Sequence, residues 1–304
     1  MNFNRLMNRI QKFIQAHDFP CWCGQRAARL VCRQMLLGRR FAVLECAACQ
    51  TQRILPKALN EQSSAATLYN EYAGQYFTDV APKQFIGSML RRLEQTGVLF
   101  GPGKRVLDVG CGSGLLLETI CERYRCTGRG IDVDRRRIDK ARTRACHAVF
   151  ECGLFDVTRL DQKYDILLST AVIEHVVNPS AFLKQFQPAL EDDGSLFLLT
   201  PNARSLNYRL LRSWWRELLS IGEHIYLFTP ESLELCANRA GFRLVQCSSD
   251  FDRASLRLRT GGLRNWLISL WSFYCEGVKR VSGVLATPRR GDILFAHFKK
   301  EKTR

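Results

Sequence analysis

Residues 106–118 read Val-Leu-Asp-Val-Gly-Cys-Gly-Ser-Gly-Leu-Leu-Leu-Glu, an apolar strand that runs into a turn and then a helical pattern. Glycine lets a backbone bend tightly and lets a ligand approach it, and a helix start offers unpaired N–H groups. Dinucleotide sites read G-x-G-x-x-G, whereas Gly110, Gly112 and Gly114 form G-x-G-x-G. Asp108, inside the strand, is placed to bind a cationic ammonium group rather than a pyrophosphate.

Strand and helix patterns alternate around this turn. The expected strands cover residues 105–109, 127–133, 148–152, 164–170 and 195–200, and the expected helices cover residues 115–122, 135–146 and 180–190. Residues 164–170 are nearly all apolar, as in a strand that is covered on both faces. The alternation predicts the α/β class, with a doubly wound parallel sheet. Two more strands are expected over 242–248 and 292–299, after a helix over 230–240.

The chain divides into three expected regions. Residues 1–60 are basic and marked by cysteines, residues 61–203 hold the alternating strands and helices, and residues 204–304 hold the last strands and an insertion over 251–290. The insertion has apolar residues at three- and four-residue steps, with eight basic and two acidic residues. Such a helix, over 262–285, is interpreted as a lid over an acceptor pocket or a homodimer contact, with peripheral contact to an anionic membrane as the alternative.

Charge and cysteine content suggest partners and compartment. The chain has 45 lysine and arginine residues against 29 acidic residues, a net charge of +16. This excess favours an anionic partner, but the basic residues form no long block and no recognisable reading module, so nucleic acid is less favoured. The sequence shows no run of about 20 apolar residues and no secretory signal. We therefore expect a cytoplasmic protein, associated with a membrane only if the insertion binds one, and we expect its thirteen cysteines to be reduced.

Two closely spaced cysteine pairs mark the first region. Cys21 and Cys23 form C-x-C, and Cys46 and Cys49 form C-x-x-C. Zinc ribbons bring two pairs together as a tetrahedral thiolate site, so this start resembles a degenerate zinc ribbon. Cys32 is an alternative member of the first pair, and simple packing of the cysteines in a core is the alternative interpretation. Four protein ligands leave no open position, so a zinc ion here would be structural.

Asp132 ends the second expected strand, 18 residues after Gly114. Ligands of doubly wound sheets bind at the carboxyl ends of the strands, where a carboxylate can accept hydrogen bonds from two ribose hydroxyls. An aspartate after a strand is also a common helix cap. Its spacing from the glycine turn favours the ligand-binding role.

Residues 106–118 resemble motif I of the class I S-adenosylmethionine (SAM)-dependent methyltransferases. The resemblance continues in order across residues 70–250, at 164–168, 171–179, 190–195, 200–202, 224–233 and 240–242. Residues 171–179 read Ala-Val-Ile-Glu-His-Val-Val-Asn-Pro and are similar to the ubiquinone-biosynthesis-like branch. The resemblance implies SAM as methyl donor and a Rossmann-like sheet of seven strands, mostly parallel with the last strand antiparallel.

The resemblance also implies which residues bind SAM. They are Asp108, Gly110, Cys111, Gly112, Gly114 and Asp132. The family usually has an acid after the third strand, near the adenine. Asp156 is the candidate here, although the distance from Asp165 along the chain matches Gly153 instead.

The methyl group of SAM is already activated, so transfer needs positioning, and a base only if the acceptor loses a proton. His175 and His224 are the candidate bases, with Glu174 beside the first, because a histidine titrates near pH ~6.5. A structural role in the loop under the cofactor is the alternative for Glu174 and His175, and His224 is favoured as a substrate contact.

These observations predict a bacterial-type SAM-dependent methyltransferase that acts on a small molecule: a sugar, a lipid-linked glycan intermediate or a quinone-like ring. An RNA methyltransferase that uses the basic surface and the cysteine region is the alternative. A non-catalytic, membrane-docking protein with the same fold is a third hypothesis, but such a protein would not need the glycine turn or Asp132.

Overall fold

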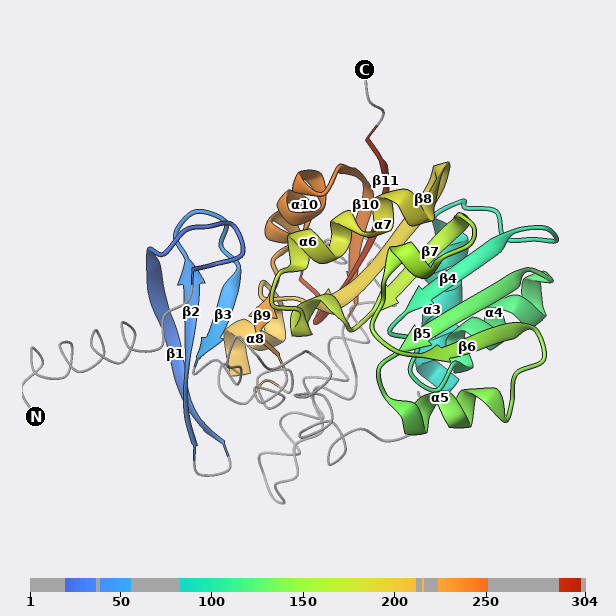
Figure 1. The fold of residues 1–304 in the computed structure, drawn as a ribbon. Helices are drawn as coiled ribbons and strands as arrows, with labels where there is room; N and C mark the ends of the chain where they lie inside the picture. The colour runs from blue at the N-terminus through green and yellow to red at the C-terminus, as the bar shows by residue number, and fades with distance from the viewer. Residues whose placement is uncertain are drawn as a thin grey trace, which may run out of the picture.

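The structure is a computed structural model that describes residues 20–36, 39–55, 83–211, 215, 224–250 and 290–301. These residues build a large sheet with helices on both faces and a small sheet beside it (Figure 1). The expected amphipathic helix over 262–285, and the insertion around it up to residue 289, lie outside the described residues.

The large sheet has seven strands in the order β10-β11-β8-β7-β4-β5-β6. Their bounds are β4 Arg105–Val109, β5 Thr127–Asp132, β6 Ala148–Cys152, β7 Tyr164–Thr170, β8 Leu190–Pro201, β10 Phe242–Asp250 and β11 Ile293–Lys300. The pairs β4–β5, β5–β6, β4–β7 and β7–β8 are parallel, whereas β11 is antiparallel to both β8 and β10. The predicted doubly wound, mostly parallel sheet with an antiparallel last strand is therefore confirmed.

Helices cover the two faces of this sheet (Figure 1). One layer contains α3 Lys83–Gln95, α4 Leu115–Tyr124 and α5 Arg135–Arg142, and the other contains α6 Pro179–Lys184, α7 Phe186–Ala189 and α10 Pro230–Arg239. Strand residues alternate between the two cores: Val106 packs with the first layer and Leu107 with the second. None of the helices among the described residues is long and apolar enough to cross a bilayer.

Two helices differ from the sequence prediction for identifiable reasons. The expected helix over 180–190 splits into α6 and α7, because Pro188 has no N–H to donate to the carbonyl of Lys184, where α6 ends. The expected helix over 135–146 ends at Arg142. Beyond it, the backbone N–H groups of Cys146 and His147 donate to Oε1 of Glu118, at 2.8 and 3.0 Å.

The small sheet contains β1 Ala28–Leu36, β2 Arg39–Cys46, β3 Gln52–Leu55 and β9 Tyr226–Leu227, in that order. All its described pairs are antiparallel. Its fourth strand comes from the segment just before α10, far along the chain, and short helix α8 (Leu206–Leu211) lies near it (Figure 1). The small sheet therefore joins the first and third of the predicted regions.

Candidate active site

The glycine turn after β4 has the backbone geometry that its sequence predicts. Gly110 and Gly114 have φ of 83° and 71°, in the left-handed region that other residues avoid. A Cβ at Gly110 would overlap Val172, and one at Gly114 would overlap the ring of Phe150. No side chain caps α4, which starts after Gly114. The turn therefore presents bare main chain at the carboxyl edge of the sheet, where a ligand can approach it.

Asp108 is a buried acid at the start of this turn. Its side chain is 1% exposed, and its Oδ1 has no hydrogen-bond partner. Burial, together with the nearby charge of Asp132, raises the pKa of Asp108 to about 7. A buried carboxylate is costly unless a cation pairs with it. This atom is therefore suited to the ammonium group of a ligand, as the sequence predicts.

Asp132 has a structural role that its sequence position does not reveal. Its Oδ2 accepts a hydrogen bond from the Gly112 N–H, and its Oδ1 accepts one from the Asp134 N–H, both at 2.8 Å. Burial is the main cause of the raised pKa of Asp132. The carboxylate thus holds the glycine turn in place. The helix cap at this strand end is Asp134, which accepts hydrogen bonds from Arg136 N and Arg137 N at the start of α5.

Cys111, another predicted SAM-binding residue, belongs to the framework of the turn. Its side chain is 9% exposed and packs in the core below α4. Its backbone N–H donates to the carbonyl of Ile131 at 3.2 Å. The thiol lies so close to Gly130 that a Cβ there would overlap it.

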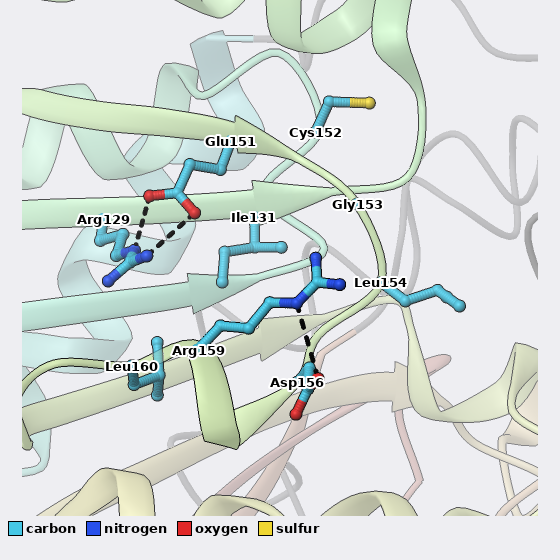
Figure 2. A pocket seen from close by; sticks show the side chains of 9 residues that line it. All are labelled: Arg129, Ile131, Glu151, Cys152, Gly153, Leu154, Asp156, Arg159 and Leu160. Carbon is cyan, nitrogen blue, oxygen red and sulfur yellow. Dashed lines mark hydrogen bonds and ion pairs between the residues drawn. The ribbon is translucent and has the colours of Figure 1, made fainter.

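Asp156 lies in the wall of a small pocket that residues at the ends of β5 and β6 also line (Figure 2). It caps the short helix η1 (Val157–Arg159): its Oδ1 accepts hydrogen bonds from Thr158 N at 3.0 Å and Thr158 Oγ1 at 2.7 Å. These bonds lower the pKa of Asp156. Gly153, the other position considered for the family's acid, lines the same pocket, and its N–H donates to the carbonyl of Asp132 at 2.9 Å.

The three predicted catalytic residues, Glu174, His175 and His224, lie together, and we call them the Glu–His cluster. Each contributes a ligand-type atom, and these atoms lie within 4.8 Å of one another. The two imidazole rings are 4.9 Å apart, centre to centre. Glu174 is 1% exposed, and its Oε2 accepts a hydrogen bond from Thr200 Oγ1 at 2.9 Å. Such a group can accept a proton, or hold a divalent cation.

The Glu–His cluster is next to the glycine turn. Glu174 and His175 belong to the short helix η2 (Ile173–His175), directly after β7 and Val172. Val172 is also the side chain that a Cβ at Gly110 would overlap. Thr200 is the partner that sequence reasoning did not single out, although it stands in the 200–202 segment that resembles the end of a family strand.

The four predicted metal ligands, Cys21, Cys23, Cys46 and Cys49, converge in the small sheet region, and we call them the four-cysteine cluster. The four sulfur atoms lie within 4.8 Å of one another. Sγ of Cys21 is 3.5 Å from Sγ of Cys49, and Sγ of Cys23 is 3.6 Å from Sγ of Cys46. Zn–S bonds of about 2.3 Å in a tetrahedron place sulfurs about 3.8 Å apart, so the geometry fits zinc. Cys32 lies on β1, away from this cluster.

Hydrogen bonding also favours a thiolate within the four-cysteine cluster. Bonds from the Cys21 thiol and from Thr51 lower the pKa of Cys49 to about 5. The hydrogen bond between Cys21 and Cys49 also raises the pKa of Cys21, because Cys21 is the donor and keeps its proton. Metal ligands must be deprotonated, and one thiolate is already favoured before a cation is bound.

Comparison with known proteins identifies the family. Residues 80–247, over half of the chain, match a family model described as a methyltransferase domain. The chain is 30% identical over 166 residues to a ubiquinone biosynthesis O-methyltransferase of Coxiella burnetii. The matched region covers 51% of this chain and 70% of that protein. It is 32% identical over 150 residues to the human mitochondrial ubiquinone biosynthesis O-methyltransferase, over 43% of this chain and 39% of that protein.

A solved structure shares the fold. A chain of the complex between the Haloferax volcanii Trm112 methyltransferase activator and a methyltransferase matches 70% of this chain and 89% of its own length. The TM-score is 0.50 at 16% identity. The chain thus belongs to the methyltransferase domain family. It is a class I SAM-dependent methyltransferase, distantly related to the ubiquinone biosynthesis O-methyltransferases.

Proposed function

We propose that the chain transfers the methyl group of SAM to a small-molecule acceptor by in-line displacement. The observation that carries the SAM site is the buried Asp108 carboxylate, with Oδ1 lacking a hydrogen-bond partner, at the start of a turn of bare main chain. The relatives named as ubiquinone biosynthesis O-methyltransferases favour a small acceptor. A quinone-like ring, a sugar and a lipid-linked glycan intermediate are the candidate acceptors.

The residues at the carboxyl edge of the sheet have distinct roles in SAM binding. Asp108 pairs with the ammonium group, and the main chain of Gly110, Gly112 and Gly114 lies against the ligand. Asp132 accepts hydrogen bonds from the ribose hydroxyls. It uses the carboxylate lone pairs that are not engaged by the N–H groups of Gly112 and Asp134. Asp156 lies at the adenine end. Bound SAM supplies an activated sulfonium methyl group, so the protein mainly has to position the acceptor and exclude water.

The Glu–His cluster forms the acceptor side of the site. If the acceptor is a hydroxyl, His224 or His175 removes its proton as the methyl group arrives, a contribution of about 10²–10⁴-fold. Glu174, held by Thr200, stabilises the imidazolium that forms. In the alternative role, Glu174 and His175 only support the loop beside the glycine turn.

The four-cysteine cluster would hold a structural zinc ion. Cys21, Cys23, Cys46 and Cys49 would supply four sulfur ligands, and two of the S···S distances are 3.5 and 3.6 Å. A complete set of protein ligands leaves no position for substrate. The zinc therefore takes no direct part in methyl transfer.

SAM binding is tested by calorimetry on the parent protein and on Asp108→Ala and Asp132→Ala. Asp165→Ala is the matched control, because Asp165 pairs with Lys104 at 2.8 Å, at the opposite edge of the sheet. The two site variants should lose most of their affinity, and the control should keep it. The absence of measurable SAM binding by the parent protein would contradict the proposed function.

The acceptor class is tested by transfer of labelled methyl from SAM into fractionated cell extract. Label in the small-molecule or lipid fraction supports the proposal, and label in the RNA fraction contradicts it in favour of the RNA methyltransferase that the +16 charge suggests. In that case RNA affinity should fall steeply with salt. The absence of any labelled fraction would favour a non-catalytic protein.

A further inference from the structure

Ile225 connects the small sheet to the Glu–His cluster through its backbone. Its N–H donates to the carbonyl of Glu174 at 2.8 Å, and its carbonyl accepts a hydrogen bond from the Ile54 N–H at 3.0 Å. Ile54 is in β3, and Ile225 directly follows His224 and precedes β9. The residue is 5% exposed, so both bonds are shielded from water. The position of His224 beside Glu174 therefore depends on where β3 lies.

The position of β3 depends in turn on the four-cysteine cluster. Two residues separate Cys49 from the start of β3, and the Cys46 N–H donates to the carbonyl of Thr51 at 2.9 Å. Thr51 is fully buried, with Oγ1 only 3.2 Å from Sγ of Cys49 and 2.9 Å from Nε1 of Trp22, which donates to it. The strand begins at the next residue and pairs with β9 through Gln52 and Arg53. The cysteine loop thus sets the start of the strand that holds β9.

The four-cysteine cluster is also attached to α10, one of the helices that cover the large sheet. The guanidinium of Arg239 lies 5.4 Å from the ring centre of Trp22 and donates to the carbonyl of Cys23 at 3.1 Å. The first cysteine pair thus rests on α10, while the second leads into β3. The cluster therefore lies between these two attachments.

The local core around the cluster is small. Among the described residues, it contains the buried side chains Cys21, Cys46 and Cys49, with Trp22 and Cys23 packed against them, and Trp22 also packs against the core of the large sheet. Small cores of this kind are usually stabilised by a disulfide or a metal, and metal binding at such sites supplies folding free energy. Among the described residues, all the cysteines are free thiols.

We propose that a zinc ion in the four-cysteine cluster is a positioning element for the acceptor side of the active site, which it fixes through β3 and Ile225. The inference rests on the proposed role of the Glu–His cluster at the acceptor. The proposed SAM-binding residues are attached to β4 and β5 rather than to β3 or Ile225. Loss of the metal therefore displaces His224 and leaves the SAM half intact.

Metal analysis provides the first test. Protein is loaded with Zn²⁺ or Co²⁺, or stripped with a chelator under reducing conditions. We expect one ion per chain and, with Co²⁺, the thiolate absorption of a tetrahedral sulfur site. Cys49→Ser should abolish both, whereas Cys146→Ser, a matched change at an exposed cysteine, should alter neither. Failure of the wild-type protein to bind either ion overturns the inference.

Imidazole NMR tests the positioning step without a known acceptor. The chain has five histidines, and His224→Gln identifies the signal of interest. Chelation should move or broaden the signals of His224 and His175. The signals of His147, which lies beside Glu118, and of His297, which lies on β11, should not change. SAM affinity, measured by calorimetry on the same samples, should not change.

Ile54→Pro separates the metal from the connection, because it keeps all four thiols and removes the N–H that donates to Ile225. This variant should bind zinc fully and still show a displaced His224 signal. With the labelled extract fraction, turnover should fall by about 10²-fold, the contribution of a positioned base, at an unchanged KM for SAM.

An unchanged His224 signal after metal loss, or in Ile54→Pro, overturns the inference. So does collapse of all the histidine signals together with SAM binding on chelation, because the metal would then hold the whole fold. Failure of the proposed function looks different: the protein would bind zinc and show the His224 response, but would neither bind SAM nor transfer a methyl group.

Discussion

Replacing Asp108 with asparagine removes a buried negative charge with almost no change of shape. Burial and Asp132 raise the pKa of Asp108 from 3.8 to about 7, so the folded chain holds this proton more tightly than the unfolded chain does. The stability that this bound proton contributes is therefore lost as the pH rises from about 4 to about 7. Above that range, the ionised Asp108 lowers the free energy of unfolding by an amount on the order of 4 kcal/mol. Asparagine is neutral over this whole pH range, so the D108N variant should not lose stability in this way as the pH rises.

The same substitution should weaken SAM binding. A bound ammonium group would compensate the buried carboxylate, and removing one partner of such a pair costs about 2–5 kcal/mol, or about 30-fold or more in affinity. Without ligand at pH 8, D108N should therefore unfold several degrees above the wild type, by about 2 °C per kcal/mol. With SAM present, the wild type should gain more stability than the variant.

Thermal unfolding at pH 5 and pH 8, with and without SAM, measures both effects. Asp165→Asn is the control: the pKa of Asp165 is lowered by Lys104 and the backbone N–H of Arg105, against the effect of burial, so this carboxylate stays ionised at both pH values. The difference in unfolding temperature between Asp165→Asn and the wild type should therefore be the same at pH 5 and pH 8. The reasoning is refuted if D108N is no more stable than the wild type at pH 8, or if it binds SAM as tightly.

Three further substitutions test the turn, a helix start and a buried histidine. Gly114→Ala adds a Cβ that overlaps Phe150 at a φ of 71°, so calorimetry should show at least about tenfold weaker SAM binding; equal affinity would contradict the steric argument. Thr229→Ala removes the side-chain half of the capping box of α10 and should cost about 1 kcal/mol in urea unfolding, and no loss would be inconsistent with a stabilising cap. Burial lowers the pKa of His297 to about 4, so protonation favours the unfolded chain and stability falls as the pH drops below 6.5. His297→Gln should therefore lose roughly 2 kcal/mol less than the wild type between pH 7 and pH 5, and an equal loss would show that another group causes the decrease.

Local sequence patterns predicted the strands that build the SAM edge. The expected strands over 105–109, 148–152 and 164–170 match β4, β6 and β7 residue for residue. Short apolar runs bounded by turn residues carry this information locally, because burial on both faces of a parallel sheet requires them. The split of the helix over 180–190 was also visible locally, since Pro188 cannot donate in a helix interior.

The roles of individual side chains were harder to predict. Asp132 and Asp156 were assigned to a ligand, and the structure shows that each also holds backbone N–H groups, of Gly112 and Asp134 and of Thr158. A carboxylate after a strand has the same sequence pattern whichever partner it binds. Only the packed turn shows how many of its lone pairs are already in use.

The sequence by itself determined the glycine turn, the order of strands and helices and the presence of a SAM-type site, because these follow from backbone freedom and from apolar spacing over a few residues. The tertiary structure decided which distant groups meet. The pairing of β3 with β9 brings the four-cysteine cluster into one connected arrangement with His224, through Ile54 and Ile225. Backbone hydrogen bonds between strands far apart in the chain are independent of side-chain type, so no local pattern encodes them.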